Sequence, residues 1–147
     1  MTLREHTKKE EVRGLTIKQP YAQLMLHGKV EVRSWSTPYR GWVLLAAAKE
    51  GYKSRDVEIL SGKYKQYIDN IMTGRHAYKG KALFIGRLVD CRLLESKDYA
   101  RTYIEETKEP MYGHFFEDVV RVFPADITGR LGYYKVSDDF LDKIVLL

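Results

Sequence analysis

Two stretches near the N-terminus decide the fold, GLTIKQPYA at residues 14–22 and GKVEVRSW at residues 28–35. In the first stretch apolar and polar side chains alternate, which is the pattern of a half-buried strand and predicts one over residues 14–18. The second stretch alternates in the same way, so a second strand is expected over residues 30–35. The fold is therefore expected to begin with two strands that are close together in the sequence.

A short helix is expected between these strands, over residues 20–27. Pro20 is favoured in the first turn of a helix, and Gly28 is typical of the position just after a helix ends. The apolar residues of this segment share one helical face: Tyr21, Leu24 and Met25. The predicted order at the start of the fold is strand, helix, strand.

The rest of the chain supplies further strands and helices. Residues 42–48 are apolar on both faces, which is typical of a central strand. Other strands are expected over residues 81–94, 115–123 and 132–136, and helices over residues 54–72, 96–106 and after a Ser137 cap. This pattern indicates an α+β fold that is mainly β, with a mixed β pseudo-barrel of about five to six strands and flanking helices.

Length and composition restrict the class of protein. A chain of 147 residues fits one domain, which is predicted over residues 14–147, while the polar residues 1–13 are expected to form a flexible arm or a short frayed helix. The single cysteine cannot form an internal disulfide, and no apolar run approaches the roughly 20 residues that cross a bilayer. We therefore expect a cytoplasmic protein, with no membrane partner, and exclude a disulfide-rich secreted one.

Positive charge is concentrated in the first two thirds of the chain. The net charge is +5, but residues 1–92 carry 18 basic and 9 acidic side chains, whereas residues 93–147 carry 7 and 11. Such an uneven distribution indicates an anionic partner on one side of the molecule.

The two opening stretches resemble the ASCH domain family. Members begin with a strand ending in Gln-Pro-Trp/Tyr-Ala, then a helix, then a Gly-x-Lys-x-x-Glu-x-Arg motif. The likeness continues in YRG at residues 39–41 and LFIGRLVDC at residues 83–91, and then from GHF at residues 113–115 to GRLGY at residues 129–133. In total it covers residues 14–136. It implies a PUA-like pseudo-barrel with a cleft for nucleotides beside the first helix. Here only Val30 separates Lys29 from Glu31, one residue fewer than in the family motif.

Glu31 and Arg33 lie two residues apart on a predicted strand, so their side chains point to the same face. From the residues alone, the favoured interpretation is a surface ion pair that contributes about 0–1 kcal/mol to stability. The resemblance implies instead that Arg33 contacts a phosphate or a base edge, with Glu31 holding it in place.

Other residues near this motif are candidates for the same cleft. Lys29 is a candidate phosphate contact or, if desolvated, a catalytic general base, and the nearby Glu31 favours the binding role. Tyr21 and Trp35 are candidates for stacking on a base, with core packing as the alternative, especially for Trp35. The resemblance adds further polar groups at the cleft: Lys18, Gln19 and Arg40. Ser34 is one more candidate RNA contact. Gln19 has a second possible role, in capping the helix that follows it.

A second basic and aromatic stretch extends over residues 62–87. It holds six Lys or Arg side chains, one acidic side chain and three tyrosines, a combination that suits RNA. Its candidate RNA contacts are Arg75, Tyr78 and Lys79. The alternative is a solvated helix face whose tyrosines belong to the core.

No metal site or cofactor is expected, because the four histidines are scattered, Cys91 has no partner at ligand spacing, and no glycine-rich phosphate loop is present. The partner expected is RNA or a nucleotide, and the sequence indicates no particular protein partner. We therefore expect an RNA-binding module in RNA processing or translation-linked regulation.

The alternative is a metal-independent hydrolase, because some ASCH domains are ribonucleases or N4-acetylcytidine amidohydrolases. The amidohydrolases pair the motif lysine with a threonine a few residues on, whereas here Ser34 is the nearest downstream hydroxyl. A ribonuclease is therefore the favoured enzyme.

Overall fold

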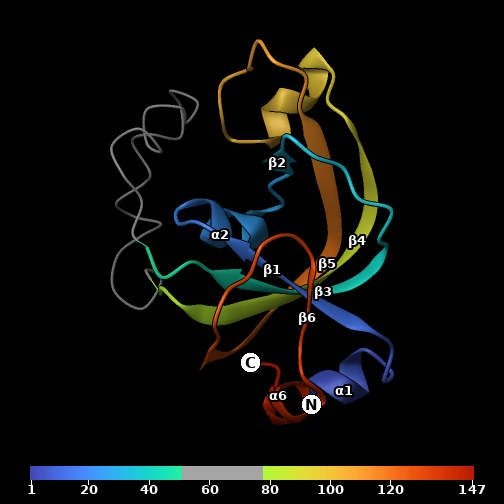
Figure 1. Ribbon diagram of the computed structural model, residues 1–147, viewed down its shortest axis with the longest axis vertical. Coiled ribbons are helices and arrows are strands. Elements are labelled where there is room, and N and C mark those ends of the chain that lie inside the picture. Colours follow the sequence, from blue (N-terminus) through green and yellow to red (C-terminus); the bar gives the residue numbers. More distant parts are fainter. Residues whose placement is uncertain (51–77) are drawn as a thin grey trace.

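The protein is described by a computed structural model for residues 1–50 and 78–147 (Figure 1). Its strands are β1 (Val12–Ile17), β2 (Glu31–Arg33), β3 (Gly41–Ala47), β4 (Lys81–Leu93), β5 (Tyr112–Asp126) and β6 (Tyr134–Lys135). They form a 6-stranded sheet in the order β2-β5-β4-β3-β1-β6. The pair β1–β3 is parallel and the other neighbouring pairs are antiparallel, so the sheet is mixed. The sheet curls into a half-barrel, which confirms the prediction of a mainly β mixed pseudo-barrel (Figure 1).

Short helices flank the sheet. They are α1 (Leu3–His6), α2 (Tyr21–Leu24) with the 3-10 helix η1 (Met25–His27), the 3-10 helix η3 (Ser96–Arg101) and α6 (Asp138–Lys143). The segments α2 and η1 confirm the helix expected between the first two strands, and the Ser137 hydroxyl caps α6 by accepting from the Phe140 N–H. None of the helices in the described ranges has the length and apolar content needed to cross a bilayer.

Of two further predicted helices, one is shorter than expected and the other stays a prediction. The helix expected over residues 96–106 is wrong in length, because η3 ends at Arg101 and Tyr103 has a φ of 66°, a left-handed conformation that a right-handed helix cannot contain. The helix expected over residues 54–72 lies outside the described residues.

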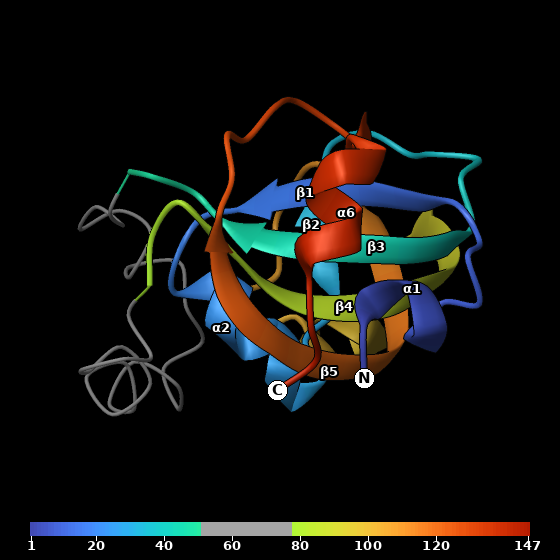
Figure 2. The same cartoon turned by 90° about the horizontal axis from the view of Figure 1, so that it is seen from below.

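The central strand β3 carries apolar side chains to both faces of the sheet. Leu45 belongs to a core cluster with Leu15 of β1 and Met25 of η1, whereas Leu44 belongs to a second cluster with Ile85 and Leu141. The strand lies between β4 and β1, as its apolar character on both faces predicts. Helices α1 and α6 lie together in front of the sheet in Figure 2, on the side of the second cluster.

The N-terminal residues pack on the rest of the protein. Helix α1 at Leu3–His6 is the short helix given as the alternative to a flexible arm over residues 1–13, and Val12 already belongs to β1. Leu3 is fully buried in the second cluster, and its N–H donates to the Ile144 carbonyl at 2.9 Å. Arg4 forms ion pairs with Asp138 at 2.8 Å and with Asp142 at 3.0 Å. These partners lie at the other end of the chain, so no local pattern could indicate them.

Candidate functional site

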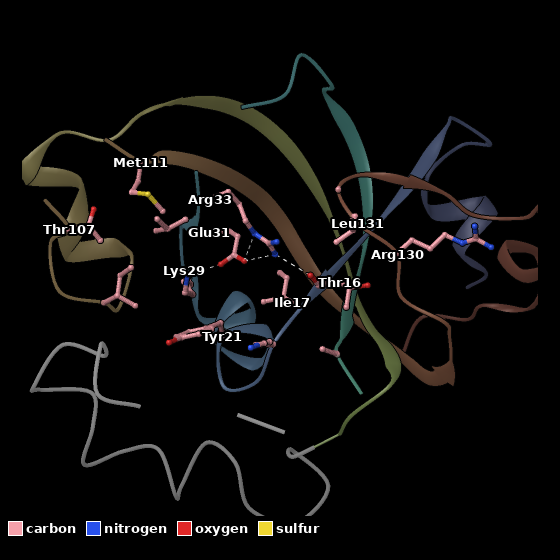
Figure 3. Close-up of a pocket in the computed structure, with 15 residues that line it drawn as sticks. Thr16, Ile17, Tyr21, Lys29, Glu31, Arg33, Thr107, Met111, Arg130 and Leu131 are labelled. Carbon is pink, nitrogen blue, oxygen red and sulfur yellow. Dashed lines mark hydrogen bonds and ion pairs between the residues drawn. The ribbon is translucent and has the colours of Figure 1, made fainter. Parts of the chain in front are cut away.

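A pocket of about 470 Å³ opens between β1, β2 and two loops (Figure 3). We call it the β2 pocket. The loops that complete it contain Thr107 and Met111 on one side and Leu131 on the other. Its apolar walls come from all of these segments: Ile17, Val32, Ile104, Met111 and Leu131. A pocket of this size with apolar walls can hold a small ligand or one unit of a larger one.

Three charged side chains form a network in this pocket. The Lys29 ammonium donates to Glu31 Oε1 at 2.9 Å and to the Val30 carbonyl at 3.0 Å. Arg33 donates from Nε and Nη2 to Glu31 Oε2, at 3.1 and 2.9 Å. The prediction that Glu31 and Arg33 share a face is therefore confirmed. We call this arrangement the Lys29–Glu31–Arg33 network.

The network is buried, which rules out the surface ion pair favoured from the residues alone. The side chains of Lys29 and Glu31 are only 2% and 7% exposed, and that of Arg33 is 24% exposed. A buried charge needs a partner, because transfer from water to a low-dielectric interior is costly. Glu31 has two cationic partners, so the network carries a net charge of about +1.

The two cations keep Glu31 ionised. Burial alone raises the pKa of this carboxyl, but the charges of Lys29 and Arg33 and their hydrogen bonds outweigh burial and lower the pKa to about 2. Each carboxylate oxygen already accepts from one of these side chains. Glu31 is therefore suited to hold the cations in place and unsuited to exchange protons near neutral pH.

Arg33 joins two strands and keeps donors for a ligand. Its Nη2 also donates to the Thr16 carbonyl at 3.1 Å, which ties β2 to β1, and its guanidinium lies 5.7 Å from the Trp35 ring. Within the described part of the chain its Nη1 has no hydrogen-bond partner. Because an arginine has five N–H donors, Arg33 can offer the two on Nη1 to a base edge or a phosphate.

Tyr21 and Lys18, two of the predicted nucleotide contacts, also line the pocket. Tyr21 lies at the start of α2, with its ring centre 5.4 Å from the Lys29 ammonium, a cation–π arrangement. Lys18 follows the end of β1 and adds a positive side chain to those of Lys29 and Arg33. The structure thus brings five of the predicted residues together in the β2 pocket: Lys18, Tyr21, Lys29, Glu31 and Arg33.

Three predicted residues do not line the β2 pocket. Gln19 is fully buried, donates to the Tyr78 carbonyl at 2.9 Å and accepts from the Gln23 N–H at 3.0 Å, so the prediction of a ligand contact is wrong and the helix-capping alternative holds. Arg40 donates to two carbonyls of its own loop and does not line the pocket. Ser34 is exposed and also lies outside the pocket lining.

The second basic surface over residues 62–87 stays a prediction, because most of it, including Arg75, lies outside the described residues. Tyr78 lines a different pocket, of about 340 Å³, together with Gln23 and Arg121. Lys79 is exposed. Neither Tyr78 nor Lys79 contributes to the β2 pocket.

Trp35 belongs to an aromatic cluster beside the pocket instead of lining it. Its ring meets that of His114 edge-on at 5.0 Å, and the His114 Nε2 lies 3.0 Å from the Trp35 carbonyl. The Tyr133 hydroxyl lies 2.8 Å from His114 Nδ1. Burial lowers the pKa of His114, so we assign the neutral ring, with Nε2–H donating to Trp35 and Nδ1 accepting from Tyr133. Trp35 packs against the core cluster, as in the core-packing alternative, and it also lines a separate pocket of about 400 Å³ with Tyr39.

Several pocket residues were not predicted, because they come from loops distant in the sequence. Ile104, Thr107 and Met111 follow η3, and no local pattern marks them. Arg130 and Leu131 lie within the GRLGY stretch, whose likeness to the family was the only available signal. Within the described residues, no group of three or more His, Cys, Asp and Glu side chains could hold a metal ion.

A scan against models of protein families finds no match, and a search of curated proteins finds none. The resemblance to ASCH domains therefore remains a prediction from the motifs quoted above.

Proposed function

We propose that this protein binds RNA and holds one nucleotide in the β2 pocket. The observation that carries the proposal is the Lys29–Glu31–Arg33 network, a buried group with a net positive charge in an open pocket with apolar walls. Charged side chains are almost never buried unless they are paired, and a paired group with a strongly shifted pKa in a cleft is a candidate functional site.

The chemistry of the pocket suits a nucleotide. The faces of a base are apolar and pack on side chains such as Ile17 and Met111, whereas its edges need hydrogen bonds. The Arg33 Nη1 group offers two N–H donors to the carbonyl and ring nitrogen acceptors of a base or to a phosphate. Lys18 and Arg130 add positive charge for the backbone.

Binding fits the network better than proton transfer does. A general base must accept a proton, but Glu31 has its pKa lowered to about 2 and both of its oxygens already accept hydrogen bonds. The Lys29 ammonium is engaged in an ion pair with that carboxylate and a hydrogen bond to the Val30 carbonyl. For this reason the hydrolase alternative has less support than binding.

The Arg33→Ala variant is expected to bind single-stranded RNA about tenfold to a hundredfold more weakly than the wild type, because it loses the paired donors. Fluorescence anisotropy with a labelled oligonucleotide, repeated at several salt concentrations, measures the affinity. The affinity of the wild type should fall steeply with salt, since phosphate contacts release counterions.

The matched control is Lys143→Ala, which removes the same charge from an exposed position of α6 outside the β2 pocket. It should weaken binding far less. Equal losses in the two variants would show that the pocket has no special role. Wild-type binding that is absent or independent of salt would contradict the proposal itself.

A cleavage assay separates binding from the ribonuclease alternative. Labelled RNA incubated with the protein and a metal chelator is expected to stay intact, as it should with the Lys29→Met variant. Gel electrophoresis measures the products. Cleavage by the wild type that disappears in Lys29→Met would favour an enzyme over a binding module.

A further inference from the structure

The depth of the network restricts how a nucleotide can reach it. Lys29 and Glu31 are almost completely buried, and Arg33 is only 24% exposed, so a ligand must enter the β2 pocket to contact their polar atoms. A base inside a helical stack is held between its neighbours and cannot enter a pocket. The bound nucleotide must therefore lie outside any stack.

A fully exposed leucine stands at the mouth of the same pocket. Leu131 is 98% exposed and lines the pocket beside Thr16. In Figure 3 it lies on the side opposite Thr107 and Met111, with Glu31 and Arg33 between. Single exposed apolar residues are common in proteins, so exposure alone does not indicate a function for Leu131. Its position at the mouth of the β2 pocket does.

The loop that carries Leu131 is held in place before and after it. Gly129 lies against β1 so closely that a Cβ there would be 2.6 Å from Thr16 Oγ1. After the leucine, the Tyr133 hydroxyl pairs with buried His114, and the Tyr134 hydroxyl lies 3.1 Å from Thr16 Oγ1. These contacts keep the loop on the sheet while the leucine side chain stays in solvent.

We propose that the substrate class is RNA in which one nucleotide turns out of a base-paired stem into the β2 pocket, while Leu131 fills the gap that it leaves. This inference rests on the proposed function. Apolar side chains inserted between base steps are a known means of unstacking them. Arg130 points away from Glu31 and Arg33 in Figure 3, so its charge is available to the phosphates beside the gap.

The test compares a hairpin RNA that carries 2-aminopurine in its stem with a single strand of the same sequence. The fluorescence of 2-aminopurine rises when it leaves the stack, and wild-type protein should produce that rise in the hairpin. Leu131→Ala should weaken binding to the hairpin about tenfold more than it weakens binding to the single strand, and it should give a smaller rise in fluorescence. Leu131→Met keeps an apolar side chain of similar length and should retain the wild-type behaviour.

The control is Leu93→Ala, which removes another exposed leucine, outside the pocket. This variant should bind both the hairpin and the single strand as tightly as the wild type does. Equal effects of Leu131→Ala on hairpin and single strand, or no rise in fluorescence with wild type, would overturn the inference. If the wild type binds the single strand but not the hairpin, the inference fails and the proposed function stands. If it binds neither RNA, both fail.

Discussion

The Glu31→Gln variant is expected to lose roughly 3–5 kcal/mol of unfolding free energy at neutral pH. Lys29 and Arg33 both depend on this carboxylate, at 2.9 Å each, and the Lys29 side chain is only 2% exposed. Removing the negative charge leaves a buried ammonium and a half-buried guanidinium without their counter-charge. Urea denaturation followed by circular dichroism measures the difference.

The same variant has a pH dependence with a defined sign. The pKa of Glu31 is lowered from its ordinary 4.5 to about 2 in the folded protein, so its contribution to stability is fully present above pH about 4.5 and is lost as the pH falls toward about 2. The stability difference between wild type and Glu31→Gln should therefore shrink over that window, because wild-type Glu31 becomes neutral there.

Glu117→Gln is the matched control, since Glu117 is exposed on β5. It should change stability by less than about 0.5 kcal/mol. A Glu31→Gln loss no larger than that of the control, or one that does not shrink on acidification, would mean that the network does not hold the pocket together.

The Leu3→Ala variant is expected to lose about 2–5 kcal/mol of unfolding free energy. Leu3 is fully buried and packs in a cluster with Leu44, Ile85 and Ile144. The truncation removes buried methyl groups and leaves a cavity that the β strands beneath cannot close. Thermal or urea unfolding measures the change.

The control for Leu3→Ala is Leu93→Ala, at a site that is 52% exposed, where the expected loss is within about 0.5 kcal/mol. Similar small losses in both variants would favour the detached N-terminal arm that the sequence suggested. A large loss only in Leu3→Ala would show that the two ends of the chain stabilise each other.

Most strands were predictable because their signals are local. The alternation through Leu15 and Ile17 predicts β1, and the apolar residues of β3 predict a central strand, because neighbouring side chains in a strand point to opposite faces. Ser137 predicts the start of α6 for a similar reason, since a cap acts within one helical turn. These features depend only on residues close in the sequence.

The candidate site was only half predictable. The shared face of Glu31 and Arg33 follows from their spacing, but their burial does not, because it depends on Thr16 and on the loops around Met111 and Leu131. Gln19 was predicted to contact a ligand, but its side-chain amide is already hydrogen-bonded to the backbone of Tyr78 and Gln23. No pattern along the chain shows whether Gln19 contacts a ligand or caps the helix that follows it.

The sequence by itself determined the order of the described strands, the alternating faces of β1 and β2, and the pairing of Glu31 with Arg33, since each depends on neighbours a few residues away. Only the tertiary structure decided that this pair is buried with Lys29, that Leu3 belongs to the core, and that Leu131 stands at the mouth of the pocket. The physical reason is that burial depends on which distant segments meet when the sheet curls, and those contacts leave no period in the sequence.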